Sequence, residues 1–373
     1  MMKNIIWILA ILVLSVSCKN EAKKSQELSQ AEEKKPEPDS ENEVEVELIR
    51  EKPSDIDTPE GMVWVSGVEF TMGARDDDPY AHPREKPAHA VAVDGFFIDK
   101  TEVTNAQFRE FAEATGYVTV AERPIDWEQI KKQLPPGTPK PHDSLLQPGS
   151  LIFRKELESV NNLYDISQWW EWKTGANWKQ PQGPGSSIKG MDDYPVVHVS
   201  TEDVQAYANW KGRDIPTEAE WEAAAHGKMH GGIYTWGDEE TPLVENANTW
   251  QGEFPVKNIP EDGYKYAAPV KSFPPNSLGI YDMAGNVWEF TKDNFDVAYY
   301  QNIAPAGLQV NPQGSPRFFN PENPYEKEKV IKGGSFLCNK SYCASYRVSA
   351  RMGMTLDSGS DHVGFRTVKR VKK

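Results

Sequence analysis

Cysteine, basic residues and long apolar runs are all scarce in this sequence. Its 373 residues include three cysteines, and 41 Lys and Arg against 56 Asp and Glu give a formal net charge of −15. Because an acidic surface repels a phosphate backbone, we expect no nucleic-acid partner. The apolar run of residues 5–16 is too short to span a bilayer comfortably, so it is typical of an export signal rather than of a membrane helix.

Several catalytic signatures are absent as well. The sequence has no Gly-x-Ser-x-Gly nucleophile elbow, no P-loop, no dinucleotide fingerprint and no cysteine spacing for an iron–sulfur cluster. Its seven histidines are scattered, and none stands at metal-ligand spacing from the later cysteines, which disfavours a tetrahedral zinc or non-haem iron site. Serine hydrolase, nucleotide-dependent and radical iron–sulfur chemistry are therefore poorly supported.

The N-terminal segment predicts an exported lipoprotein. The apolar run ends in Leu14-Ser15-Val16-Ser17-Cys18, which resembles a bacterial lipobox. We predict a signal peptide over residues 1–18, with Cys18 as the lipid anchor that holds the chain at the membrane of the cell envelope, facing the periplasm or the cell surface. Residues 19–58 are rich in Lys, Glu, Ser and Pro, so a disordered tether is expected there.

One folded domain is predicted for residues 59–370, because no linker-like stretch divides this range and no fixed-period repeat occurs in it. Alternating runs over residues 63–72, 90–98 and 330–334 predict strands. Residues 122–190 are rich in Pro, Trp and Gly with little periodicity, and so much irregular chain is more often functional or metal-braced than idle. We expect an α+β fold that is rich in loops and low in regular secondary structure.

Two short helices are predicted by their end signals. Thr104 is an N-cap before a helix that has Gln107 at its third position, and Gly116 ends this helix. Thr217 caps a second helix, whose first turn is acidic and which Gly227 ends.

The folded domain contains two thiols, Cys338 and Cys343, once Cys18 is assigned to the lipid. In an exported protein two neighbouring cysteines are consistent with a structural disulfide, although closing so small a loop stabilises the fold little. A redox pair is a second interpretation. A soft-metal site is a third, because thiolates are the ligands that select Cu(I). The residue pattern alone leaves these interpretations open.

Two stretches are rich in oxygen ligands. The first joins residues 246–250 with residues 261–263, and the second is 282–289. Carboxylates, amides and the carbonyls of Gly/Asn-rich turns suit calcium, but ordinary Asx-turn chemistry explains the same residues equally well.

Several short motifs are spread over about residues 60–368: Gly61-Met62-Val63-Trp64-Val65, Thr101-Glu102-Val103-Thr104-Asn105, Pro216-Thr217-Glu218-Ala219-Glu220-Trp221-Glu222, Gly285-Asn286-Val287-Trp288-Glu289, Gly333-Gly334-Ser335 and Gly364-Phe365-Arg366. In this set the chain resembles the formylglycine-generating enzyme (sulfatase-modifying factor) family. The motifs occur in non-enzymatic members too, so they imply the fold, a single C-type-lectin-like domain. The cysteine pair in Cys338-Asn339-Lys340-Ser341-Tyr342-Cys343 is more specific, because it separates oxidases from structural relatives.

The resemblance implies a copper-dependent oxidase. By it, Cys338 and Cys343 bind Cu(I), a substrate cysteine joins as a third thiolate, and dioxygen is reduced while that cysteine becomes formylglycine. Ser335, Tyr342 and Trp288 match family positions that line the pocket. The implied substrate is an unfolded sulfatase polypeptide with a Cys-x-Pro-x-Arg segment, and the enzyme is expected to be a monomer.

The resemblance also implies two structural calcium (Ca²⁺) sites. Their residues are the side chains of Asn248 and Asp262 with the carbonyls of Thr249 and Tyr264, then the side chains of Asp282 and Glu289 with the carbonyls of Gly285 and Val287. Asp282 replaces a common asparagine. Asn339 replaces a residue that is often larger and basic beside the first thiol, which leaves the substrate preference open.

Two other readings use the same fold. A non-catalytic envelope scaffold lipoprotein of the gliding-motility type is also compatible with an anchored acidic chain. A sulfoxide synthase would need an iron site on an additional helical domain, for which the sequence has no room.

Overall fold

The computed structural model describes residues 46–143 and 146–372. The predicted signal peptide, Cys18 and most of the predicted tether lie outside the described residues. None of the helices in the described ranges is long and apolar enough to cross a membrane.

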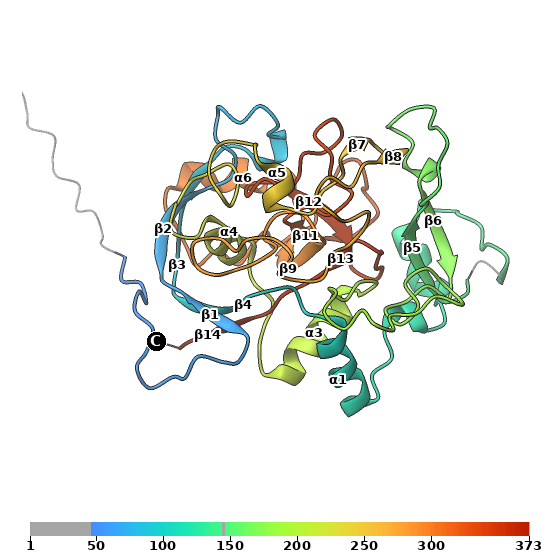
Figure 1. Cartoon of the computed structure of the whole chain (residues 1–373), viewed down its shortest axis with the longest axis horizontal. Helices are drawn as coiled ribbons and strands as arrows, with labels where there is room; N and C mark the ends of the chain where they lie inside the picture. The colour runs from blue at the N-terminus through green and yellow to red at the C-terminus, as the bar shows by residue number, and fades with distance from the viewer. Residues whose placement is uncertain (1–45, 144–145, 373) are drawn as a thin grey trace, which may run out of the picture. The chain divides into compact units, whose positions relative to one another are not determined.

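The described part contains short helices and short strands joined by long loops (Figure 1). The α-helices are α1 Asn105–Thr115, α2 Trp127–Ile130, α3 Thr201–Lys211, α4 Glu218–His226, α5 Leu243–Asn246 and α6 Tyr299–Ile303. The strands are β1 Met62–Val65, β2 Val68–Met72, β3 His89–Val93, β4 Phe96–Asp99, β5 Gly149–Phe153, β6 Trp170–Thr174, β7 Gly252–Glu253, β8 Lys257–Asn258, β9 Trp288–Asn294, β10 Gln309–Val310, β11 Glu328–Lys332, β12 Arg351–Thr355, β13 Val363–Gly364 and β14 Val368–Arg370. The expected loop-rich α+β fold is confirmed.

A four-stranded sheet of order β12-β11-β9-β13 forms the frame of the domain. Strands β9, β11 and β12 are antiparallel neighbours, whereas β13 pairs with β9 in parallel through Val363 and Trp288. Two three-stranded sheets, β1-β4-β14 and β10-β3-β2, and the hairpins β5-β6 and β7-β8 complete the set. The loops that leave β11 and enter β9 and β13 therefore meet at one region of the central sheet.

Two of the predicted strands are each divided in the structure. The run over residues 63–72 is β1 and β2, and the run over 90–98 is β3 and β4, with the two halves of each run in different sheets. The amides of Gly67 and Gly95 both donate to the carbonyl of Ile49, at 3.1 and 2.7 Å. A Cβ at Gly67 would lie 2.5 Å from that carbonyl oxygen, so only glycine allows the chain to turn there.

Both predicted helices are confirmed with their caps. Thr104 and Gln107 form a capping box on α1, and Gly116 follows it in the left-handed conformation. Thr217 and Glu220 cap α4 in the same way, with Gly227 at its end. The prediction missed α3, although Ser200 and Asp203 form the same reciprocal box there.

Helix α4 is buried along its whole length, because it packs against β2 and β3 on one side and β9 and β11 on the other. Its acidic residues are paired inside the protein. Glu222 accepts a 2.8 Å bond from Lys332, and Glu218 accepts a 2.7 Å bond from Arg351. Buried charges require partners of this kind, so the helix is held by ion pairs as well as by apolar contacts.

Two residues of the predicted tether contact the folded domain. Leu48 is buried, and the amide of Ile49 donates to Asp94 at 2.8 Å. The tether predicted to end at residue 58 is too long on this side, because the bonds to Ile49 tie its last part to the β2-β3 and β1-β4 sheets.

The irregular segment of residues 122–190 contains the β5-β6 hairpin and short helical turns. In Figure 1 this hairpin lies on the opposite side of the domain from β2 and β3. The Ser150 hydroxyl donates to the Gly359 carbonyl at 2.7 Å, and the amide of Phe153 donates to Asp361 at 3.1 Å. The hairpin is therefore bound to the loop that leads into β13.

Candidate active site

Cys338 and Cys343 lie in one compact loop that follows β11. Gly334 has a φ of +76°, and a Cβ there would lie 2.7 Å from the carbonyl oxygen of Ser345. The amide of Cys338 donates to the Ser335 carbonyl at 2.8 Å, and the Asn339 carbonyl accepts the amides of residues 342–344 at 3.0 Å each. Main-chain bonds alone thus bring the two thiols to the same place.

Both thiols are free in the structure, with Cys338 buried and Cys343 half-buried. A hydrogen bond between the thiols, helped by Ser345 and Asn339, lowers the pKa of Cys343 to about 7. Burial and the neighbouring Cys343 raise the pKa of Cys338 well above its ordinary value. The first thiolate of the pair therefore forms on Cys343 near neutral pH.

Ser335 contacts Cys338 directly, whereas Trp288 shares an apolar cluster with it. The Ser335 amide donates to the Cys338 sulfur at 3.4 Å, and the Ser335 hydroxyl accepts the amide of Leu337 at 3.2 Å. Trp288 begins β9, is buried, and belongs to the same apolar cluster as Cys338, with Cys343 packed against it. The central sheet supplies both positions.

Tyr342 lies at the open edge of the thiol loop. Its side chain is 37% exposed, and its ring stacks on Phe254 with centroids 4.6 Å apart. Trp169 meets it edge-on at 5.9 Å. Burial and the two thiols raise the pKa of Tyr342 to about 12, so its phenol remains protonated at neutral pH.

Asn339 faces the protein rather than a substrate. Its amide nitrogen donates to the carbonyls of Trp250 and Gly252, at 2.9 and 3.3 Å. Its amide oxygen accepts the amide and hydroxyl of Ser341, at 2.9 and 2.6 Å. The side chain is buried and fully bonded, so in this geometry it has no polar group left to contact a substrate.

His362, which sequence reasoning did not single out, joins this site from the far side. Its Nδ1 lies 3.1 Å from the Ser335 hydroxyl oxygen, and its carbonyl accepts the amide of Trp288 at 2.9 Å. Trp170 packs against the ring at 4.7 Å. Burial, with a contribution from His198, lowers the pKa of His362 to about 3, so the imidazole is neutral.

The first predicted calcium set comes together around Asp262. Its carboxylate accepts the amides of Thr249 at 3.0 Å and Tyr264 at 2.9 Å. The Gln251 amide nitrogen lies 2.5 Å from the Thr249 carbonyl oxygen and 3.0 Å from Asp262, so these oxygens surround one point. The Asn248 side-chain oxygen is buried without a hydrogen-bond partner. These donors fit a hard cation.

The second predicted set adjoins the first. The Asn286 amide donates to the Asn248 carbonyl at 2.9 Å, and Gly285 forms an isolated β-bridge with Asn248. Burial raises the pKa of Asp282 to about 6. Glu289 is engaged elsewhere, since both of its oxygens lie 2.6 Å from Arg366. Val287 is buried between Asn286 and Trp288, and no hydrogen bond to its carbonyl is described.

Glu102 belongs with the second set, although the prediction omitted it. One of its oxygens accepts the Asn286 side chain at 2.9 Å, and the carboxyl groups of Glu102 and Asp282 share a hydrogen bond. Burial and the charge of Asp282 raise the pKa of Glu102 well above its ordinary value. Three carboxylates, those of Glu102, Asp282 and Glu289, share the charge of Arg366, so a divalent cation would fit the excess negative charge.

No three His, Cys, Asp or Glu side chains within the described ranges converge as a metal site by themselves. Both predicted calcium sets therefore depend on amide and main-chain oxygens in addition to carboxylates.

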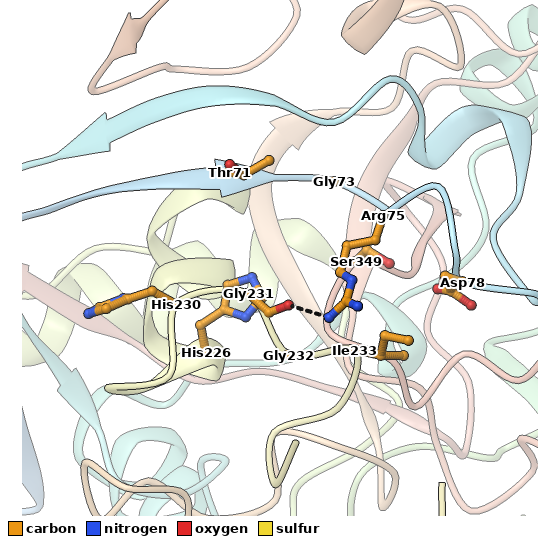
Figure 2. A pocket seen from close by; sticks show the side chains of 10 residues that line it. All are labelled: Thr71, Gly73, Arg75, Asp78, His226, His230, Gly231, Gly232, Ile233 and Ser349. Atoms are coloured by element: carbon orange, nitrogen blue, oxygen red, sulfur yellow. Dashed lines mark hydrogen bonds between the residues drawn. The ribbon is translucent and has the colours of Figure 1, made fainter. Parts of the chain in front are cut away.

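The described part also contains two notable cavities that lack the thiols. One, of about 240 Å³, is lined by Arg75, His226 and His230 and is shown in Figure 2. In Figure 2 the carbonyl of Gly231 accepts a bond from Arg75 at 3.3 Å. The other, of about 750 Å³, borders Trp127 and the loop before β13. Neither cavity includes a predicted site residue.

Known proteins support the assignment of the fold. A model of the sulfatase-modifying factor enzyme 1-like domain matches residues 47–371. The chain is 41% identical to a formylglycine-generating enzyme of Thermomonospora curvata, over 86% of this chain and 96% of that protein. It is 39% identical to a formylglycine-generating enzyme of Bos taurus, over 83% of this chain and 74% of that protein.

Two further similarities mark the range of this fold. The chain is 37% identical to the inactive C-alpha-formylglycine-generating enzyme 2 of Mus musculus, over 82% of this chain and 84% of that protein. PvdO from Pseudomonas aeruginosa shares the fold, with a TM-score of 0.55 at 24% identity over 83% of this chain and 94% of PvdO. The chain therefore belongs to the sulfatase-modifying factor enzyme 1-like family, together with the formylglycine-generating enzymes.

Proposed function

We propose that this enzyme oxidises a cysteine of a sulfatase polypeptide to formylglycine, with Cys338 and Cys343 as the working pair. The observation that carries the proposal is the state of the two thiols: both are free, they hydrogen-bond to each other, and the pKa of Cys343 is lowered to about 7. A structural disulfide would remove both from chemistry. The relatives named formylglycine-generating enzymes support the reaction class.

We propose Cu(I) as the cofactor of the pair. Two adjacent thiolates form a soft donor set, which suits Cu(I) better than a hard cation, and the hydrogen bond between the thiols supports two sulfurs within reach of one ion. When bound there, copper would supply the electron-transfer chemistry that activates dioxygen. The protein contributes the geometry and the protonation state of the ligands.

The surrounding residues bind substrate and exclude water. Trp288 has a buried ring in the apolar cluster that contains Cys338. Tyr342 is exposed, and its ring stacks on the buried Phe254, so an extended peptide can pack on Tyr342. A water-poor pocket protects a reactive intermediate, so this division of roles suits an oxidase.

We propose that calcium binds the two oxygen-rich sets and stabilises the loops that support the thiols. The buried Asn248 oxygen, which has no hydrogen-bond partner, favours such an ion at the first set, and the two adjacent buried carboxyl groups of Glu102 and Asp282 favour one at the second. We also propose export and lipid anchoring at Cys18, on the pattern of residues 1–18. Substitution of Cys18→Ala should release the chain from the membrane fraction of its cells.

The test is conversion of a peptide. Purified full chain is loaded with Cu(I) and incubated in air with a reducing thiol and a peptide that contains Cys-x-Pro-x-Arg. We expect the peptide mass to fall by the amount that replacement of the thiol by an aldehyde oxygen requires. Cys338→Ser and Cys343→Ser should each abolish the change, and an unconverted peptide with wild-type protein would favour the non-catalytic scaffold.

A further inference from the structure

The Ser335 hydroxyl has one side-chain partner, and that partner is His362. The hydroxyl oxygen accepts the Leu337 amide at 3.2 Å and lies 3.1 Å from Nδ1 of His362. The same serine is fixed on the thiol pair, because its amide donates to the Cys338 sulfur at 3.4 Å. Ser335 thus contacts the first thiol through its main-chain amide and the imidazole through its hydroxyl.

The imidazole is held from two directions. The main-chain carbonyl of His362 accepts the amide of Trp288, which fixes His362 directly before β13 and beside β9. Trp170, on β6, packs on the ring at 4.7 Å and 59°. The ring orientation is therefore set by the sheet below and by the hairpin above.

The second ring nitrogen, Nε2, is available. No hydrogen bond to Nε2 is described in residues 46–143 or 146–372, and the atom is not fully enclosed, since His362 is half-buried. A neutral imidazole has one protonated and one unprotonated nitrogen, so it can accept a proton at one and release a proton from the other. Ser335 and His362 therefore form a continuous path from the thiol pair toward solvent.

We propose that His362 is a positioning residue that orients the Ser335 hydroxyl and conducts the substrate thiol's proton to solvent through it. The inference rests on the proposed oxidase function. A substrate cysteine enters as a thiol, and its S–H bond must break before it can act as a thiolate. The electron pair stays on sulfur, and no redox change occurs in this step.

In the resting state, Nε2 of His362 carries the proton and Nδ1 does not. The substrate proton moves to the Ser335 oxygen while the original hydroxyl proton moves to Nδ1 of His362. Nε2 then releases its own proton to water. The Ser335 hydroxyl group is re-formed in this step, and no side chain has to rotate for the forward transfer.

The first test uses the protein without copper or substrate. Nitrogen-15 NMR of the histidines in the full chain reports which ring nitrogen of His362 carries the proton. We expect Nε2 to be protonated and Nδ1 to accept from Ser335, with Ser335→Ala altering the Nδ1 shift. A protonated Nδ1 would overturn the proposed path, whether or not the enzyme converts peptide.

The second test compares variants in the peptide assay. His362→Phe keeps a ring under Trp170 but removes both nitrogens, and we expect its kcat/KM to fall about a hundredfold, the usual effect of losing a proton-transfer group. His226→Ala is the matched control. His226 is buried, lacks hydrogen-bond partners for both ring nitrogens and lines the cavity of about 240 Å³ shown in Figure 2. Its removal should therefore leave kcat/KM unchanged.

The third test separates proton transfer from structure. His362→Ala leaves space for free imidazole, which should restore its activity at least tenfold while leaving wild type unaffected. Thermal unfolding and competition for Cu(I) with a chromophoric chelator should match wild type. Activity of His362→Phe within threefold of wild type would overturn the proposal, as would a loss in His362→Ala that imidazole does not restore. Inactive wild type would refute the oxidase instead.

Discussion

Asn339 offers the sharpest test of the site, because the sequence leaves its role open and the structure gives it a structural one. The resemblance places Asn339 beside the first thiol and does not decide whether it affects substrate preference. The structure buries its side chain and uses it in four hydrogen bonds to Trp250, Gly252 and Ser341. We therefore predict that Asn339→Ala lowers stability and leaves peptide recognition intact.

The expected loss of stability depends on which hydrogen-bond partners of Asn339 water can reach after the substitution. Ser341 and Gly252 are exposed, so water can replace their bonds to Asn339. Trp250 is buried, and its carbonyl would lose its 2.9 Å partner. An unsatisfied buried carbonyl costs about 1–3 kcal/mol, so we expect the free energy of unfolding to fall by about 2 kcal/mol. The Asn339 carbonyl still holds the turn of residues 342–344, so the thiol loop should persist.

Chemical unfolding of the full chain measures this loss, and peptide titration measures KM on the same preparations. Asn339→Asp keeps the acceptor for Ser341 but turns a negative charge toward the Trp250 carbonyl, so it should destabilise at least as much. Lys340→Ala is the matched neighbour, since its exposed ion pair with Glu240 is worth less than about 1 kcal/mol. Unchanged stability with a raised KM in Asn339→Ala would refute the reasoning and indicate that the Asn339 side chain contacts the substrate.

Three further predictions concern charge. In reduced, copper-free protein, alkylation followed by mass spectrometry should show Cys343 reacting with a pH midpoint near 7, while Cys338 resists; equal reactivity would contradict the assignment. In the presence of a calcium chelator, the free energy of unfolding should fall by about 3 kcal/mol as the pH rises from about 4 to 6. The reason is that Asp282 has a pKa of about 6 in the folded protein, above its value in the unfolded chain, so folding favours its protonated form. Added calcium should abolish this pH dependence of stability in thermal unfolding. Lys332→Met should cost about 3–5 kcal/mol by leaving Glu222 buried and unpaired, as measured by denaturant unfolding against wild type.

The local parts of the fold were predictable from sequence. Thr104 and Thr217 define helix starts because a capping box involves residues three apart, and such signals need no tertiary information. The box at Ser200 carries the same signal, so α3 could have been found by it. The division of the run over residues 63–72 could not, because it depends on the distant carbonyl of Ile49.

The site divides in the same way. The thiol pair and Ser335 were predictable because a single loop after β11 holds them. Glu102 and His362 were not, since Glu102 reaches Asn286 across 184 positions and His362 reaches Ser335 across 27. Their side chains are ordinary in sequence, and only the packing of the sheet loops brings Glu102 to Asp282 and His362 to Ser335.

Trp250 connects the two kinds of site. Its amide donates to the Cys338 carbonyl at 3.0 Å, and its carbonyl accepts from the Asn339 side chain at 2.9 Å. One residue earlier, the Thr249 amide is bonded to Asp262 in the first oxygen-rich set. An ion at that set would fix the main chain that supports the thiol loop, because bonds of consecutive residues cannot move independently. The oxygen-rich loops therefore help to hold the thiol loop in place through main-chain hydrogen bonds, although none of their side chains needs to touch a sulfur.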